Sequence, residues 1–229
     1  MMVLGDNKGH VYEKKIVKIL EEKQLLPVGT AGAGSGPGSD IAFSYRGTNC
    51  RIEIKNNVIG PDYGQKRLIP KKVGGEWKWD WAPSVKELKI TKYYTKQGVL
   101  DYLNEKKIIP NKYRKDNSEL TLKDVKGDQK TFEDRSHTIP DEAFIIFYED
   151  KADYVQIGNG YGLFHLRHDK AKLGTEQFHG EFILRFRAKR HTTKDFHSYS
   201  FFATLACKKI HKRSQFNLEN YPNQEFPFT

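Results

Sequence analysis

Apolar residues near the start of the chain recur with helical spacing. Residues 9–26 read GHVYEKKIVKILEEKQLL, in which the positions on one side of a helix are Tyr12, Ile16, Val17, Ile19 and Leu20. Asp6 or Asn7 is placed to act as the N-cap. The pattern therefore predicts an amphipathic helix over this stretch.

The next stretch, residues 27–39, is PVGTAGAGSGPGS and predicts a flexible loop. Its glycine spacing does not match a dinucleotide-binding fingerprint, and no strand precedes it. It also lacks the Gly-Lys-Ser/Thr ending of a phosphate-binding P-loop. A nucleotide-binding loop is therefore excluded.

Farther along the chain, strand-like alternation predominates. Besides a hairpin near residue 47, the pattern predicts a loop at 58–72, a strand at 75–83 and a polar insertion or mobile loop at 111–136. It predicts a helix at 84–107, with a Ser84–Glu87 capping box and a break near Gly98. It also predicts β-structure at 143–148, at 153–166 as a hairpin about Asn159-Gly160, at 180–191 and at 196–207. These elements predict one mixed α/β domain, residues 1–229, with a β-rich C-terminal half.

Composition narrows the class of protein. The 229 residues are 37% hydrophobic and 30% charged, which is polar but globular. Two cysteines do not supply a disulfide framework or a cysteine-based zinc site. No apolar run is long enough to span a membrane, and MMVLGDNKGH lacks the apolar core of a signal peptide. We therefore expect a soluble, cytoplasmic protein without a membrane partner.

The formal net charge of +10 is concentrated near the C-terminus. Residues 185–213 hold nine Lys or Arg and a single acid, Asp195. Such a stripe is typical of a nucleic-acid-binding surface, although a solvated basic face is the simpler alternative. The best candidates for phosphate contacts lie in RFRAKRH, where alternation places Arg185, Arg187 and Lys189 on one face, followed by Arg190.

The most informative stretch is GPGSDIAFSYRGTNCRIEIKNN, residues 36–57. A turn at residues 46–49 would pair Tyr45 with Cys50 and would give one wholly apolar face. The other face would then carry Asp40 opposite Lys55, and the small Ala42 opposite Glu53. This register therefore predicts two carboxylates and an ammonium on the same side of one hairpin.

Two carboxylates so close together repel each other unless a cation lies between them or one is protonated. Mg²⁺ prefers oxygen ligands and usually takes one or two protein carboxylates together with phosphate oxygens; Mn²⁺ is the expected substitute. Lys55 could orient or deprotonate a water molecule beside such a metal. The alternative is a surface salt bridge between Asp40 and Lys55, with Glu53 solvated.

These residues resemble the PD-(D/E)xK nuclease superfamily, which includes restriction endonucleases and Holliday-junction resolvases. Asp40, Glu53 and Lys55 match its motif, although Ser39 replaces the proline. The resemblance covers residues 9–67 and implies a restriction endonuclease-like core, a mixed central sheet flanked by helices. It also implies that the carbonyl of Ile54 completes the metal site. Two further positions match those used by some members, namely Glu13 on the first helix and Gln65 after the second strand.

The resemblance implies Mg²⁺-dependent hydrolysis of DNA by an endonuclease. The DNA could be duplex or branched, and both a restriction-type and a structure-specific enzyme stay open. Because cutting both strands often uses two active sites, a homodimer is one expected assembly. The alternative function is a nucleic-acid-binding protein without catalysis.

One strand face carries three tryptophans, Trp77, Trp79 and Trp81. They either stack on bases or, as we favour, pack in the core.

Overall fold

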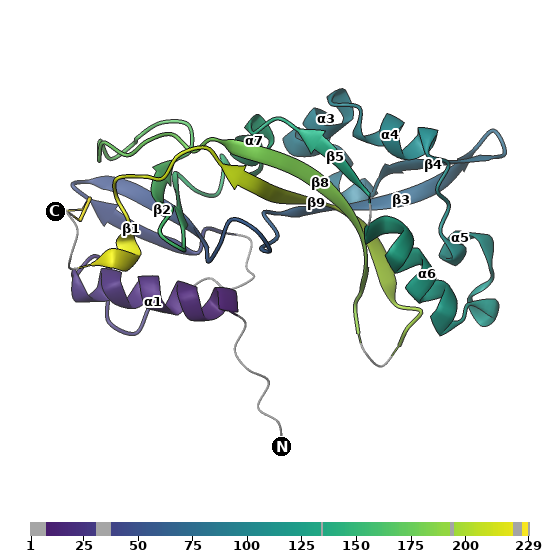
Figure 1. Ribbon diagram of the computed structural model, residues 1–229, viewed down its shortest axis with the longest axis horizontal. Coiled ribbons are helices and arrows are strands. Elements are labelled where there is room, and N and C mark those ends of the chain that lie inside the picture. Colours follow the sequence, from purple (N-terminus) through teal and green to yellow (C-terminus); the bar gives the residue numbers. More distant parts are fainter. Residues whose placement is uncertain (1–7, 31–37, 134, 193–194, 222–225, 229) are drawn as a thin grey trace, which may run out of the picture. The chain divides into compact units, whose positions relative to one another are not determined.

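The computed structural model describes residues 8–30, 38–133, 135–192, 195–221 and 226–228. It has mixed α/β architecture with two sheets, and the chain divides into two compact units. Unit 1 comprises Met1–Pro61, Phe147–Glu181 and Cys207–Thr229, and unit 2 comprises Asp62–Ile146 and Phe182–Ala206. Figure 1 shows the elements of both units. The expected caps, Asp6 and Asn7, lie outside the described residues.

Unit 1 contains a four-stranded sheet with the order β1-β2-β6-β7. Its strands are β1 (Ile41–Tyr45), β2 (Thr48–Lys55), β6 (Tyr154–Ile157) and β7 (Gly162–His165). β2 and β6 are parallel, whereas β1–β2 and β6–β7 are antiparallel. The sheet is therefore mixed, and the hairpin that we predicted about Asn159-Gly160 is confirmed.

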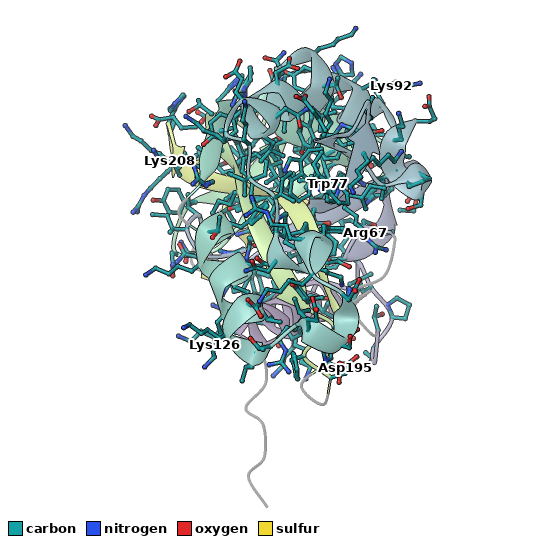
Figure 2. The ribbon with its side chains drawn as sticks, turned by 90° about the vertical axis from the view of Figure 1, so that its right-hand side faces the viewer. Arg67, Trp77, Lys92, Lys126, Asp195 and Lys208 are labelled. Atoms are coloured by element: carbon teal, nitrogen blue, oxygen red, sulfur yellow. The ribbon has the colours of Figure 1, made fainter. Side chains whose placement is uncertain are left out.

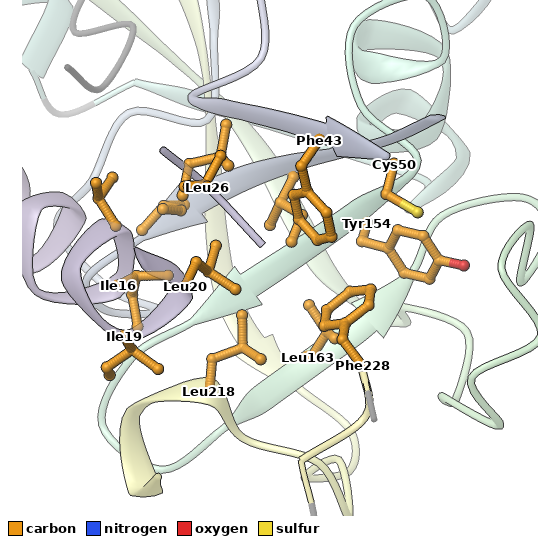
Figure 3. Close-up of a cluster of buried hydrophobic side chains, with 14 of the residues drawn as sticks. Ile16, Ile19, Leu20, Leu26, Phe43, Cys50, Tyr154, Leu163, Leu218 and Phe228 are labelled. Atoms are coloured by element: carbon orange, nitrogen blue, oxygen red, sulfur yellow. The ribbon is translucent and has the colours of Figure 1, made fainter. Parts of the chain in front are cut away.

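Helix α1 (Lys8–Glu22) covers one face of this sheet. Its apolar side contributes Ile16, Val17, Ile19 and Leu20, all of which are buried. Figure 3 shows Ile16, Ile19 and Leu20 in one cluster with Phe43, Cys50, Tyr154 and side chains of the C-terminal segment, including Leu218 of the 3-10 helix η2 (Leu218–Asn220). The amphipathic pattern therefore identified both the helix and its buried side, because only that side avoids water.

The register of the β1–β2 hairpin differs from our prediction by two residues. Tyr45 pairs with Thr48, and Ile41 pairs with Ile52, so the turn contains only Arg46 and Gly47. Both turn residues have positive φ (48° and 75°), which is type I′ geometry and matches the twist of the two strands. The predicted four-residue turn, and with it the pairing of Ala42 with Glu53, is wrong.

Unit 2 is built around a five-stranded sheet with the order β4-β3-β9-β8-β5. Its strands are β3 (Gln65–Val73), β4 (Glu76–Trp81), β5 (Ser136–Ile139), β8 (Gly180–Arg190) and β9 (Tyr199–Ile210), of which the last two begin or end in unit 1. The helices are α2 (Pro83–Lys86), α3 (Lys89–Lys96), α4 (Val99–Glu105), α5 (Asn111–Arg114), the 3-10 helix η1 (Asn117–Glu119), α6 (Leu122–Glu133) and α7 (Glu142–Tyr148), which ends in unit 1.

The loop predicted at residues 58–72 is wrong in its second half, which forms β3. Pro70 pairs with Trp79, whose N–H donates to the side chain of Asn104 and not to β3. At such a non-hydrogen-bonded position a proline removes no ladder bond. The strand therefore tolerates the residue that made the stretch resemble a loop.

Residues 143–148 form helix α7 and not the predicted strand. A short apolar run fits a buried helix as well as a buried strand, and here Ala143, Phe144, Ile145 and Tyr148 are buried.

The predicted Ser84–Glu87 capping box is also wrong, because helix α2 begins at Pro83 after an Ala82 N-cap without a side-chain bond. The break at Gly98 is confirmed by its left-handed backbone, φ 75°.

Residues 111–136, the expected insertion or mobile loop, contain α5, η1 and α6 rather than a continuous loop. Two apolar residues of α6, Val125 and Phe132, are fully buried. Phe132 packs against Trp79 of β4, and Trp81 packs against Tyr94 of α3. Both tryptophans therefore serve the core of unit 2, whereas Trp77 is half-buried.

Candidate active site

The two acids of the predicted site are next to each other in unit 1. β1 and β2 pair from Ile41 with Ile52 onward, so continuing the register by one residue places Asp40 opposite Glu53. Residues opposite each other in an antiparallel pair lie on the same side of the sheet. The corrected register therefore brings the two carboxylates closer than the diagonal arrangement that we predicted.

The side chain of Asp40 is held by the backbone of the opposite strand. Its Oδ2 accepts a hydrogen bond of 2.7 Å from the N–H of Ile54. In an antiparallel pair the N–H and C=O of one strand residue point toward the same neighbour. The carbonyl of Ile54 is therefore on the same edge of β2 as the Asp40 carboxylate.

The carboxyl group of Asp40 is electrostatically strained. Burial and then repulsion from Glu53 raise the pKa of Asp40 to about 7, with a smaller contribution from Glu13 in the same direction. The Lys55 ammonium and the Ile54 N–H oppose this rise in pKa. A cation that binds here would stabilise the ionised carboxylate of Asp40, because it would relieve the repulsion from Glu53.

Lys55 lies beside Glu53 on the same face of β2. Its Nζ donates to Glu53 Oε1 at 2.5 Å, and the two side chains are 14% and 7% exposed. The ammonium also lies 5.7 Å from the centre of the Tyr148 ring. The ion pair is thus largely shielded from water, unlike the surface pair that the alternative interpretation required.

Glu13 acts on the candidate site through its charge. It lies on α1, and its carboxylate acts on Asp40. The preceding residue, Tyr12, accepts a hydrogen bond of 3.0 Å from Gln156 of β6. The amide of the fully buried Gln156 also donates to Asn217 at 2.8 Å. This buried network ties α1 to the sheet and thereby sets the position of Glu13.

The donor set fits a hard divalent cation. Asp40 and Glu53 would supply carboxylate oxygens, and Ile54 would supply its carbonyl, which are the ligands that Mg²⁺ takes in proteins. Within the described part of the chain, no group of three or more His, Cys, Asp or Glu side chains is arranged to hold a metal ion. A site with two side-chain ligands and one carbonyl does not depend on such a group.

The predicted phosphate-binding residues gather in unit 2 around an acid that sequence reasoning missed. Asp62 accepts hydrogen bonds from Arg185 at 3.0 Å, from Arg187 at 3.1 Å and from Lys189 at 2.6 Å. Lys189 also donates to Gln65 Oε1 at 2.6 Å. Three of the five predicted residues therefore meet at one carboxylate, and Gln65 joins them through Lys189.

Burial opposes ionisation of Asp62, but Lys189, Arg187 and Arg185 together hold the pKa of its carboxyl below the usual range. The buried residues between them, Phe186 and Ala188, turn to the opposite face, as predicted. Arg190, the fifth predicted residue, is on that opposite face by alternation.

The residues that sequence reasoning missed have no local signal. Asp62 stands alone in GPDYG, more than 120 residues from its three partners. Tyr148 was assigned to a strand, and Gln156 to the middle of a hairpin. Only contacts between residues far apart in the chain reveal their roles.

Helices of membrane-spanning length and hydrophobicity are absent from the part of the chain that the structure describes. No protein-family model, curated protein or solved structure matches this chain. The candidate function therefore depends on the geometry above.

Proposed function

We propose that this protein is a Mg²⁺-dependent deoxyribonuclease of the PD-(D/E)xK type, acting as an endonuclease on duplex or branched DNA. The observation that carries the proposal is the hairpin site. Asp40, Glu53, Lys55 and the backbone of Ile54 meet at one end of β1 and β2, and burial leaves Asp40 poised to ionise when a cation binds.

The fold supports the same proposal. A helix precedes the hairpin, the Glu-x-Lys strand lies in the interior of a mixed sheet, and β6 extends that sheet in parallel. A restriction endonuclease-like core implies this order of elements. Unit 1 holds all of the residues to which we assign catalytic roles.

Each residue has a defined task in this proposal. Asp40 and Glu53 would hold Mg²⁺ together with the Ile54 carbonyl, and Glu13 would add negative charge beside them. The metal, when bound, would neutralise charge that develops on the scissile phosphate. Lys55 would orient the attacking water through its Nζ, and would accept the proton of that water only as the neutral amine. Arg185, Arg187 and Lys189 would bind the DNA backbone, and Gln65 would assist through Lys189.

One observation favours the second candidate, a nucleic-acid-binding protein without catalysis. Lys55 already neutralises the charge of Glu53 through a close ion pair, so the site does not require a metal to balance that charge. The two candidates differ in what Mg²⁺ does: it is required for the first and irrelevant for the second. Cleavage by a homodimer, with one site for each strand, belongs only to the first candidate.

The test is incubation of the purified protein with Mg²⁺ and linear duplex, single-stranded and four-way-junction DNA. We expect Glu53→Ala to abolish metal-dependent cleavage while DNA binding is retained. Glu176→Ala is the matched control, because Glu176 also forms an ion pair with a lysine, Lys212, in unit 1. Full cleavage by Glu53→Ala would overturn the assignment. Discrete products from plain duplex would indicate a restriction-type enzyme, and cleavage at branches alone would indicate a resolvase.

A further inference from the structure

A cluster of basic residues of unit 2 lies on one face of the five-stranded sheet. The contact between Lys189 of β8 and Gln65 of β3 shows that both side chains lie on the same face. Arg67 follows Gln65 by two residues and therefore shares this face, and Phe202 of β9 pairs directly with Arg67. We call this surface the β8–β9–β3 face; its residues are Arg185, Arg187, Lys189, Gln65, Arg67 and Phe202.

The charge of the β8–β9–β3 face complements a polyanion. Among these residues and Asp62, the acid that binds three of them, four cations and one carboxylate leave a net charge of +3. Asp62 accepts hydrogen bonds from Arg185, Arg187 and Lys189, so the positions of these three cations are set before any ligand binds. Arg67 is exposed, and Figure 2 labels it on its strand.

Phe202 gives the face a second kind of contact. Its neighbour Phe201 points to the other side, where it is fully buried against Trp79 and Phe132. Phe202 itself stays half-buried beside Arg67. An aromatic ring and a guanidinium among cations form a platform on which unpaired bases stack.

The width of the sheet decides which form of nucleic acid fits. Five strands about 4.8 Å apart span roughly 19 Å. The major groove is about 12 Å wide and admits a helix or a two-stranded ribbon. A five-stranded face does not enter it, so Phe202 can reach only bases that are already unpaired. We infer that the β8–β9–β3 face binds single-stranded DNA, with Phe202 as a base-stacking residue and the cations on the phosphates.

This inference rests on the proposed function in one respect, the choice of DNA as the ligand. It deepens that function, because a single-strand site would direct a nuclease toward branched or partly unwound substrates. Since binding is measured in EDTA, it is independent of cleavage.

The test is fluorescence anisotropy of the full chain in EDTA with a labelled 20-nucleotide oligo-dT and a labelled 20-base-pair duplex. We expect the wild type to bind the single strand at least fivefold more tightly than the duplex. Phe202→Ala should weaken oligo-dT binding about tenfold, within the range of one lost base stack, and should leave duplex binding within twofold. Phe202→Leu keeps the apolar volume without the ring, so it should show the same loss even if the alanine variant folds poorly.

Two further variants sharpen the test. Trp77→Ala is the matched control, because Trp77 is a half-buried aromatic residue on the opposite face of the same sheet; it should change neither affinity. Arg187→Gln should reduce the slope of log K against log salt for oligo-dT by about 0.7.

Equal or tighter binding of duplex, tighter binding of oligo-rU than of oligo-dT, or loss of oligo-dT binding in Trp77→Ala rather than in Phe202→Ala would overturn the inference. A wild type that cleaves DNA but shows one of these results would disprove the single-strand site alone. Phe202-dependent binding without Mg²⁺-dependent cleavage would disprove the nuclease alone.

Discussion

The backbone N–H of Ile54 donates a hydrogen bond of 2.7 Å to the carboxylate of Asp40. Asp40 follows a glycine-rich stretch, and this bond fixes it to β2. The same strand carries Glu53 and Lys55 on either side of Ile54. The site therefore depends on one short hairpin, whose residues are adjacent both in sequence and in space.

The first prediction concerns the stability of the protein against pH. The pKa of Asp40 is raised to about 7 from an ordinary value of 3.8, so the folded state favours the neutral carboxyl. Its contribution to stability is complete below about pH 4 and is lost as the pH rises through 7. Asp40→Asn does not titrate. We therefore expect the stability of Asp40→Asn relative to wild type to increase by about 2 kcal/mol between pH 5 and pH 8 in EDTA.

Urea unfolding at the two pH values measures this difference. Adding Mg²⁺ at pH 8 should stabilise the wild type and not Asp40→Asn, because binding of the metal requires the ionised carboxylate. Parallel pH profiles for the two proteins would show that Asp40 ionises normally.

The second prediction concerns the ion pair of Lys55 and Glu53. Lys55→Gln leaves a buried carboxylate without its cation, so we expect a loss of about 3 kcal/mol in the free energy of unfolding without metal. The double variant Glu53→Gln/Lys55→Gln should lose less than Lys55→Gln alone, because no unpaired charge stays buried. Cleavage should fall at least about 100-fold in Lys55→Gln.

Denaturant unfolding and a cleavage assay check both parts. Lys212→Gln serves as the control, since its ammonium is 76% exposed and its ion pair should contribute under about 1 kcal/mol. Wild-type cleavage by Lys55→Gln would remove Lys55 from the mechanism.

The third prediction assigns Glu13 to the site. Glu13→Gln removes a charge that raises the pKa of Asp40, so the pKa of Asp40 should fall in this variant. An NMR titration of the Asp40 carboxyl measures the shift. Glu22→Gln, which changes an exposed acid at the other end of α1, should leave the titration unchanged. An identical Asp40 titration in both variants would place Glu13 outside the site.

The fourth prediction tests the hairpin register. Gly47 has φ 75° in the two-residue turn, so Gly47→Ala should cost about 1 kcal/mol through backbone strain. Gly38 has an ordinary φ, and an added Cβ would meet no atom within 4 Å. Gly38→Ala should therefore change the melting temperature little. Equal melting temperatures for both variants would argue against a positive φ at residue 47.

Much of unit 1 follows from local patterns. The helical spacing around Ile16 and Leu20 identified α1, and strict alternation from Ile41 to Lys55 identified both the hairpin and its two faces. The register was nevertheless two residues off. A slip of two preserves the faces, since side chains alternate with period two, and therefore the hydrophobic pattern does not detect it. The turn decided the register, through positive φ at Arg46 and Gly47.

By itself, then, the sequence determined which residues alternate, which side of α1 is buried, and that Asp40, Glu53 and Lys55 share a face. These properties depend on neighbours within a few residues. Only the tertiary structure decided that Asp62 gathers Arg185, Arg187 and Lys189, that residues 143–148 are helical, and that β2 lies inside a sheet beside β6. Such features depend on contacts between residues far apart in the chain, where burial and strand pairing outweigh local preference.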